Sequence, residues 1–459
     1  MRKKFQQKSL GTYYTCPEIT TYLSKRTIHG CILQKINAAR VLDDARGHYF
    51  SSMEALLLNL ETGLCRKLLA ILPTISILDP ACGDGAFLVA ALETLIGVYE
   101  AITSRMAILH DPDLARWLEQ ARAEYGNLTY FLKKKIICEN LFGVDIMQEA
   151  VETTKQRLYQ ALTASEFASI EPVTAIPFNI RTGNALIGLL RLERYMQDGD
   201  RTCLNRLLFA EFKQLNITYA QATWDAQKER TGKPIARALT IEDIEALQPF
   251  HWGYEFPQIM NERGGFDIVI TNPPWEIYKP QAKEFFATHS ELVRKNSMRI
   301  EDFALERSRL LQASEIRSAW LDYASRFAYQ SAYFRSAAQY RRQVSIINGK
   351  KYGSDVNLYK LFTEQCYNLL REGGFCGLVI PSGIYTDLGA KNLREMLFEQ
   401  ARITGMCCFE NTKTIFAQVH RSYKFVVLMV VIMKSRSYTH LVKLVGNAPK
   451  VAQQLCSEM

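Results

Sequence analysis

Several common signatures are missing from this sequence. It contains eleven cysteines, but no pair has the Cys-x-x-Cys spacing of a zinc site or a redox motif. A zinc site and a disulfide framework are therefore not expected, and a reduced cytosolic protein is the simplest interpretation. Residues 1–6 are charged, but no apolar segment follows them, so a secretory signal is not expected either. The longest apolar run, residues 425–433, is too short to span a bilayer and predicts a buried strand.

Phosphate-binding and nuclease signatures are missing too. There is no Gly-x-x-x-x-Gly-Lys-Ser/Thr sequence, and only one Gly-x-Gly, at Gly83–Gly85. A phosphate cradle is therefore not indicated. No nuclease-type arrangement of acidic residues and lysine stands where a nuclease domain requires it. Internal repeats and low-complexity linkers are also lacking, which argues against a repeat protein or a disordered one.

What is present is typical of a large folded protein. The chain has 459 residues, of which 48% are hydrophobic, so it can bury a large core and hold more than one domain. Its net charge of +9 and its pI of about 8.9 are compatible with a nucleic-acid partner but do not require one.

The most informative segment is the apolar run 266–271, which is followed by Asn272-Pro273-Pro274-Trp275. The run is short and β-branched, so it predicts a buried strand, and the prolines predict a stiff loop at its carboxyl end. Ligands bind at that edge of an open α/β sheet. An amide side chain, backbone carbonyls and a large aromatic ring suit a planar ring that carries an amino group.

Three upstream segments also end in polar residues. A strand over 75–78 leads into the turn from Asp79 to Gly85, and an apolar helix begins near Ala86. This is a nucleotide-binding βα unit, and Asp79 favours a cationic ligand over a pyrophosphate. A second strand ends at Asp145, which can hold a ribose diol. A third short strand ends in the turn that contains Asn184.

A helix is also expected near the N-terminus, after the turn-like segment 11–19. Thr15 is the predicted cap of this helix, and Pro17 suits its first turn.

The α/β rhythm resumes after residue 357. A helix over 357–371 precedes a strand over 375–380, and further strands are predicted at 403–409 and 424–433. The expected fold class is α/β with helical insertions. Residues 276–345 are rich in Arg, Tyr, Phe and Gln, a mixture that can line a nucleic-acid channel or simply form an amphipathic helical layer. The expected organisation is an N-terminal helical region 1–72, a catalytic domain 73–435 with insertions at about 98–135, 189–262 and 276–345, and a tail 436–459.

Together these motifs resemble the S-adenosylmethionine-dependent adenine-N6 DNA methyltransferases of the gamma arrangement. The resemblance extends to the methylase part of type IIG restriction-modification enzymes and related phage-defence enzymes. It rests on an ordered set of motifs from about residue 10 to residue 435: GTYYTCPEI, LDPACGDGAF, FGVDI, GNAL, HWGYEFP, NPPWE and NLYKLF…LREGGFCGLVIPSGI. It implies a Rossmann-like class I methyltransferase sheet, mostly parallel with the last strand antiparallel.

The resemblance also implies roles for individual residues. The cofactor S-adenosylmethionine would lie against Asp79, Ala81, Gly83 and Gly85 with its methionine part, and against Asp145 and Ile146 with its ribose and adenine. Tyr14, Thr15 and Pro17 would form a wall on the methionine side of the cofactor, and Asn184 would contact the amino group of the cofactor's adenine. The target base would be held by Asn272, Pro273, Pro274 and Trp275, with a second stacking ring at Phe416.

Each assignment has a simpler alternative. Asn272-Pro273-Pro274-Trp275 could be a strand-ending turn with a buried indole, Asp145 a capping or solvated acid, and Asn184 the head of an Asx-turn. Phe416 could be plain core.

The function implied by the resemblance is methyl transfer to N6 of a flipped adenine in DNA, without a metal. The alternatives are methylation of cytosine N4, RNA or protein glutamine, and a non-catalytic DNA-binding subunit with a relict site. Members of the family usually carry a target-recognition domain after the last core strand, whereas here about 25 residues follow it. Sequence specificity is therefore expected to be weak or to depend on a separate specificity or restriction subunit.

Overall fold

The computed structural model describes residues 15–43, 49–164, 172–193, 200–228, 230–295, 298–352, 355–417 and 419–433. Tyr14 and the tail 436–459 lie outside these ranges.

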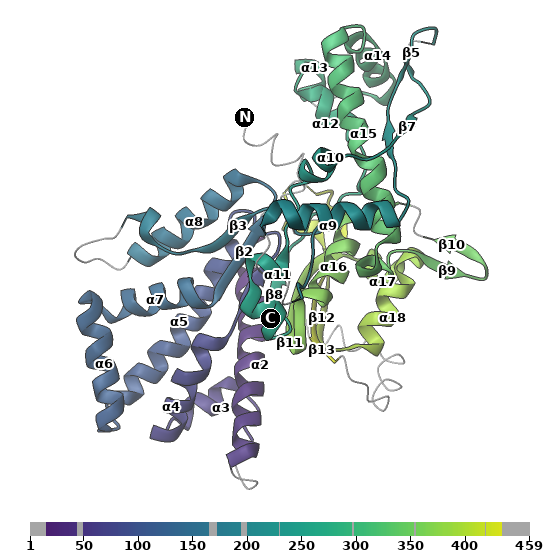
Figure 1. The fold of residues 1–459 in the computed structure, drawn as a ribbon. Coiled ribbons are helices and arrows are strands. Elements are labelled where there is room, and N and C mark those ends of the chain that lie inside the picture. The colour runs from purple at the N-terminus through teal and green to yellow at the C-terminus, as the bar shows by residue number, and fades with distance from the viewer. Residues whose placement is uncertain are drawn as a thin grey trace.

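A seven-stranded sheet lies at the centre of the molecule (Figure 1). Its strands are β1 (Ile77–Asp79), β2 (Leu141–Asp145), β3 (Asn179–Thr182), β8 (Phe266–Thr271), β11 (Leu370–Pro381), β12 (Ala401–Glu410) and β13 (Lys424–Ile432). They are arranged in the order β12-β13-β11-β8-β1-β2-β3. β13 is antiparallel to both of its neighbours, and every other adjacent pair is parallel. The predicted fold class, a mostly parallel sheet with an antiparallel last strand, is confirmed.

Helices lie on both faces of this sheet, some against the strands and others against neighbouring helices. They are α2 (Pro17–Asp43), α3 (Met53–Leu58), α4 (Thr62–Ile71), α5 (Ala86–Met106), α6 (Pro112–Tyr125), α7 (Leu128–Glu139), α8 (Gln148–Thr163), α16 (Leu358–Leu369), α17 (Gly383–Thr386) and α18 (Lys391–Glu399). Short 3-10 turns lie at Leu72–Thr74, Val173–Ala175, Ala338–Tyr340, Leu388–Ala390 and Asn411–Lys413. α5 is long and apolar enough to cross a membrane, but 61% of its most apolar window is buried against the rest of the protein.

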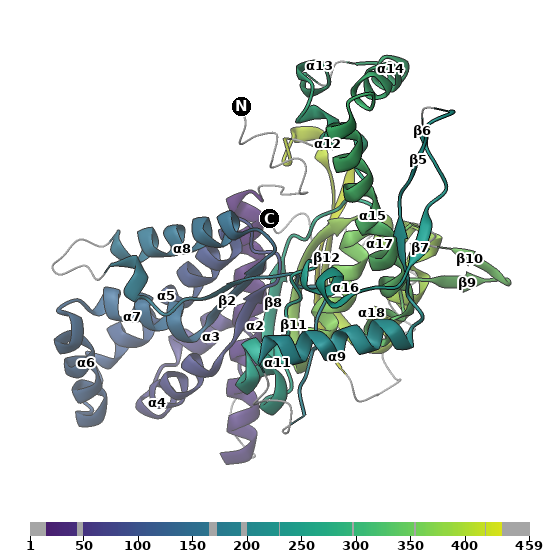
Figure 2. The same cartoon turned by 45° about the horizontal axis from the view of Figure 1, so that its top comes forward.

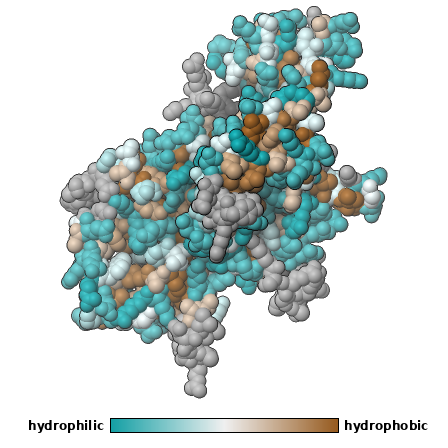
Figure 3. Space-filling model, viewed as in Figure 1, coloured by the Kyte–Doolittle hydropathy of each residue, from teal (hydrophilic) through white to brown (hydrophobic). Residues whose placement is uncertain are grey.

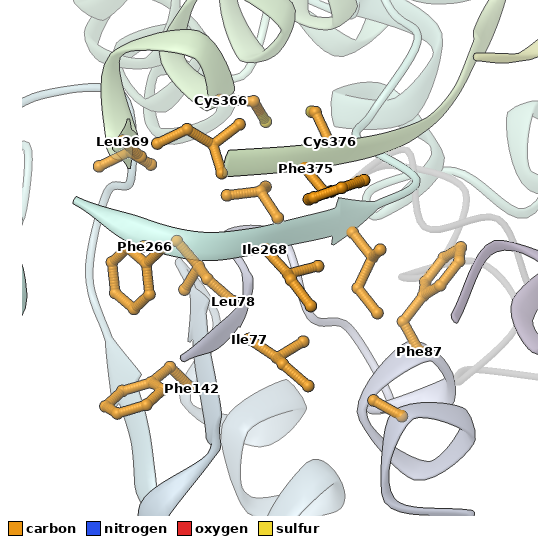
Figure 4. Close-up of a cluster of buried hydrophobic side chains, with 14 of the residues drawn as sticks. Ile77, Leu78, Phe87, Phe142, Phe266, Ile268, Cys366, Leu369, Phe375 and Cys376 are labelled. Carbon is orange, nitrogen blue, oxygen red and sulfur yellow. The ribbon is translucent and has the colours of Figure 1, made fainter. Parts of the chain in front are cut away.

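Successive side chains of β11 point to opposite faces of the sheet and so meet different layers of helices (Figure 4). Phe375 packs against α2, where a Cβ on Gly30 would come within 2.7 Å of the Phe375 ring. The next residue, Cys376, points to the opposite face and meets Cys366 of α16. The absence of a side chain at Gly30 therefore lets α2 lie directly on the sheet.

The start of α2 differs from the expected one in its cap. Thr15 was the predicted cap, but Cys16 directly precedes the first helical residue, and its carbonyl accepts the N–H groups of Ile19 and Thr20. Thr15 stands one residue too early for that role, and its hydroxyl is used elsewhere.

The insertion 189–262 is less helical than expected. It holds α9 (Arg201–Gln214), α10 (Ile241–Glu245), α11 (Trp252–Glu255), a π-helical turn (Gln258–Glu262) and two ribbons formed by β4 (Tyr219–Gln221) with β7 (Ile235–Arg237) and β5 (Trp224–Asp225) with β6 (Arg230–Thr231). These strands have only two or three residues and little burial, so they leave no alternating pattern in the sequence.

The insertion 276–345 forms a projecting lobe (Figures 1 and 2). Its helices are α12 (Ala282–Ala287), α13 (Glu291–Arg294), α14 (Ile300–Leu310) and α15 (Ser314–Ser336), and the hairpin β9 (Ser345–Ile347) with β10 (Lys350–Tyr352) follows. The lobe has a small core of its own around Phe286 and Trp320, against which Trp224 of β5 packs. Figure 3 shows a surface that is hydrophilic over most of this view, on the lobe as well as on the body of the molecule.

A buried ionic cluster lies at the amino end of β8. Asp267 is fully buried, and its carboxylate contacts Lys35 Nζ at 2.8 Å, Arg371 Nε at 2.8 Å and Arg263 Nη2 at 2.6 Å. The N–H of Ser76 donates to it at 2.9 Å. Burial alone would raise the pKa of Asp267, but attraction to Lys35 and Arg371 and the hydrogen bonds outweigh burial and hold the pKa at about 2. The cluster ties α2, β8 and β11 together.

We expect Asp267→Asn to lower the free energy of unfolding by roughly 3 kcal/mol, because it removes the buried carboxylate that three partly exposed basic side chains share. Urea denaturation at pH 7 measures this effect. Glu395→Gln, which breaks the exposed Lys391–Glu395 pair, is the matched control and should change stability by less than about 1 kcal/mol. Equal effects of the two substitutions would show that the cluster is not a special element of stability.

Candidate functional site

Parallel pairing brings the predicted site residues to one edge of the sheet. β1 lies between β8 and β2, and β3 lies beside β2. The carboxyl ends of these strands carry Asp79, Asn272, Asp145 and, just past β3, Asn184. The sequence predicted each strand end separately, and the sheet order brings them together.

The turn after β1 is held by main-chain and side-chain contacts. The Ala81 N–H donates to Asp79 Oδ1 at 3.1 Å, and Gly83 and Gly85 have φ values of 54° and 80°. A Cβ on Gly85 would lie 2.8 Å from the Thr154 side chain, whereas a Cβ on Gly83 would meet no atom within 4 Å. Gly85 is therefore required by packing, and the backbone at Gly83 faces open space.

Asp145 connects this turn to β2. Its Oδ2 accepts the Gly83 N–H at 2.9 Å, and its Oδ1 accepts the Met147 N–H at 2.9 Å. Burial raises the pKa of Asp145 against the opposing effect of these backbone donors. Ile146, the next residue, is 50% exposed despite its apolar side chain. An anchored acid beside an exposed apolar residue is an arrangement that suits a sugar with a flat ring next to it.

Asn184 forms the Asx-turn that was the simpler alternative for this residue: its Oδ1 accepts the Leu186 N–H at 3.1 Å. The carbonyls of this turn are held from outside. Ala185 O accepts hydrogen bonds from Trp252 Nε1 at 3.2 Å and Gln365 Nε2 at 2.8 Å. The sequence did not point to Gln365, because it lies on α16, far away in the chain.

The Asn272 amide is engaged at both ends. Its Nδ2 donates to Thr15 Oγ1 at 3.0 Å, and its Oδ1 accepts the Trp275 indole N–H at 3.0 Å. The same N–H also lies 3.2 Å from Val379 O of β11. Thr15 thus lies beside the predicted base-binding amide, whereas Pro17 starts α2 and is exposed. Pro273 is buried and Pro274 half-buried in the loop.

The rings around Trp275 are arranged differently from the predicted sandwich. Trp275 is only 6% exposed and Phe416 only 1%, and the two rings meet edge to face at 5.0 Å. In this geometry Phe416 packs as core and does not present a face to a base. Tyr423, which sequence reasoning missed, lies nearly parallel to the indole, with ring centroids 5.6 Å apart and an angle of 12°. Its position just before β13 was the one signal that could have drawn attention to it.

Asp79 has a distinctive electrostatic environment. It is 1% exposed, and burial raises its pKa to about 7, with further contributions from the charges of Asp145 and Asp84. Asp84 itself is paired with Arg157 of α8. Near neutral pH the site therefore holds a carboxylate that gains from a positively charged ligand.

S-adenosylmethionine is the cofactor that the family resemblance implies for this edge of the sheet. The ligand has a cationic amino-acid part, a ribose and a planar adenine. The open space beside Gly83 lets the ligand approach the backbone, and the Asp79 carboxylate offers a negative charge to the cationic part. Asp145 offers a hydrogen-bond acceptor for the ribose, and Ile146 offers an apolar surface for the adenine. The residues present fit the group.

The sheet order and the polar strand ends define a Rossmann-like fold of the class I methyltransferase type. The chain belongs to the Eco57I restriction-modification methylase family, whose model matches residues 139–308 and 331–416. A protein of Methanocaldococcus jannaschii named as a type II restriction enzyme and methyltransferase is 26% identical over 362 residues. That match covers 61% of this chain and 29% of the relative, so the chain corresponds to a minor part of its length.

Solved structures with a similar arrangement include a DrdV–DNA complex and the EcoKI M protein. The DrdV match has 13% identity and a TM-score of 0.40, and covers 94% of this chain and 27% of that one. The EcoKI match has 11% identity and a TM-score of 0.32, and covers 78% and 40% of the two chains.

We expect Asp79→Asn to raise the stability of the ligand-free protein at pH 8 by roughly 2 kcal/mol. A carboxyl whose folded pKa is raised stabilises the fold fully below its unfolded pKa near 4, and this contribution is lost as pH rises to about 7. The gain from the substitution should therefore disappear at pH 4. Urea denaturation at the two pH values measures it, and an equal effect at both would contradict the assignment.

Proposed function

We propose that this protein transfers a methyl group from S-adenosylmethionine to N6 of an adenine in DNA, as part of a restriction-modification or phage-defence system in a bacterial or archaeal cytoplasm. The observation that carries the proposal is the Asn272 amide at the end of β8, beside the Asp79 turn at the end of β1. Membership of the methylase family supports the reaction class.

In this proposal Asn272 prepares the target amine. The lone pair of the adenine amine is delocalised into the ring, which makes it a poor nucleophile. Asn272 Oδ1 has already accepted one hydrogen bond and has a second lone pair for an amine N–H. The Pro273 carbonyl is the second proposed acceptor. Together they draw the nitrogen toward tetrahedral geometry, so that its lone pair points at the methyl donor.

The cofactor supplies a methyl group on a positively charged sulfur. In our proposal Asp79 holds the amino-acid part of the cofactor by charge, while Asp145 accepts the ribose hydroxyls and Ile146 covers the adenine. As the amine gains the methyl group it loses one proton, which passes to solvent, so no residue has to be a strong base.

A base in a duplex must leave the stack to reach Asn272, at a cost of a few kcal/mol. Stacking on an aromatic ring contributes roughly 1–3 kcal/mol and offsets part of that cost. Because Tyr423 lies parallel to Trp275, a base that stacks on that indole face has to displace Tyr423.

The central test is transfer of tritiated methyl groups to unmethylated genomic DNA, followed by nucleoside analysis. Wild type should place the label in N6-methyl-2′-deoxyadenosine, and Asn272→Ala should reduce transfer at least about 100-fold, because it removes an acceptor used in the transition state. Asn59→Ala, an exposed residue at the end of α3, is the matched control and should retain wild-type transfer. Label in N4-methylcytosine, or transfer only when RNA or protein replaces the DNA, would favour another substrate, and cofactor binding without transfer to any of these would favour a non-catalytic subunit.

Cofactor binding gives a second, separate prediction. Asp79→Asn should weaken S-adenosylmethionine binding about 10-fold, because it removes a charge-assisted contact. It should leave the affinity for 5′-methylthioadenosine, which lacks the amino-acid part, nearly unchanged. In wild type the affinity for S-adenosylmethionine should rise between pH 6 and pH 8, as Asp79 with its pKa of about 7 ionises. Calorimetry measures all three effects, and an equal loss for both ligands would remove Asp79 from this role.

A further inference from the structure

The side chain at position 275 has a property that a phenyl or phenol ring lacks. Its indole N–H is a hydrogen-bond donor only, and it is directed at Asn272 Oδ1 at 3.0 Å and at Val379 O at 3.2 Å. Stacking needs only a flat ring. Stacking alone therefore gives no role to the indole N–H.

The donor decides which way the Asn272 amide faces. An amide can be rotated by 180° so that its oxygen and nitrogen exchange places. Thr15 Oγ1, at the nitrogen end, tolerates both orientations because a hydroxyl can accept or donate. The Trp275 N–H tolerates only one, since the rotated amide would point its own N–H groups at another donor.

The indole is in turn fixed in place. Trp275 is only 6% exposed. Its ring lies among those of Phe416, Tyr423 and Phe425, at centroid distances of 5.0, 5.6 and 6.0 Å. Val379 belongs to β11, which is paired with β8 on one side and β13 on the other. The indole N–H is therefore held at a fixed position relative to the sheet.

We infer that Trp275 is a positioning residue: its indole N–H fixes the Asn272 amide with the oxygen available to the target amine. The inference rests on the function proposed above, and it adds a role for the fourth residue of the loop that stacking does not supply. Thr15 supports the same orientation without selecting it.

A direct structural test uses the indole N–H signals. The chain has five tryptophans, so protein labelled with ¹⁵N at tryptophan gives five indole signals, and the one lost in Trp275→Phe is that of Trp275. Asn272→Ala should shift this signal more than any of the other four. An unmoved Trp275 signal would overturn the inference whether or not the protein is an active methyltransferase.

The kinetic test removes the donor and keeps an aromatic ring, although the phenyl ring is smaller than the indole. Trp275→Phe should lower kcat for methyl transfer by about 2-fold if both amide orientations become equally populated, and by about 10-fold if the oxygen turns to the Thr15 hydroxyl. The KM for DNA should change less than kcat. Thr15→Val should lower kcat by less than Trp275→Phe, because the selecting donor is still present.

Two controls separate positioning from general damage to the fold. In an Asn272→Ala background, Trp275→Phe should cause no further loss of the residual single-turnover rate, because no amide remains to be oriented. Trp320→Phe, the same change at a buried tryptophan of the lobe, should leave kcat unchanged. A loss that persists in the Asn272→Ala background would overturn the inference, whereas absence of transfer by wild type would overturn the proposed function instead.

Discussion

The parallel pairing of β1 with β8 is the constraint on which the site depends. Ile77 is paired with Ile268 and Leu78 with Val269, so Asp79 and the Asn272 loop leave the sheet at the same edge and side by side. About 190 residues separate the two strands in the chain, and only the sheet brings them together. A shift of one residue in this register would turn the alternate side chains to the opposite faces and would separate the two ends.

The two ends of the sheet treat buried carboxylates in opposite ways. At the amino end, Asp267 is surrounded by three basic side chains, and its pKa falls to about 2. At the carboxyl end, Asp79 accepts the Ala81 N–H and has two further acids nearby, and burial raises its pKa to about 7. The first arrangement stabilises the fold. The second arrangement destabilises the ligand-free fold at neutral pH, and a cationic ligand can neutralise the buried Asp79 carboxylate. Shifted pKa values of this kind are typical of functional sites.

The fold was largely predictable from the sequence, because it depends on local patterns. The strand 266–271 has the bounds that its apolar run predicted, and the helix after Gly85 begins at Ala86 as expected. The antiparallel last strand followed from the family resemblance. The ribbons of the 189–262 insertion were not predictable, because strands of two or three half-exposed residues carry no periodic signal. Likewise, the sequence marked Thr15 as a helix cap, since nothing near it in the chain points to Asn272.

By itself the sequence determined which chemical groups stand at the strand ends: an acid at the end of β1, an acid at the end of β2, an amide after β3, and the Asn272 loop after β8. These follow from short-range rules on apolar runs, glycine and proline. Only the tertiary structure decided what those groups contact, because the partners come from distant parts of the chain. Thr15 and Trp275 hold opposite ends of one amide, Gln365 braces the Asn184 turn, and Phe416 is buried while Tyr423 lies along the indole. The physical reason is that hydrogen bonds and ring packing depend on distance in space, which sequence separation does not give.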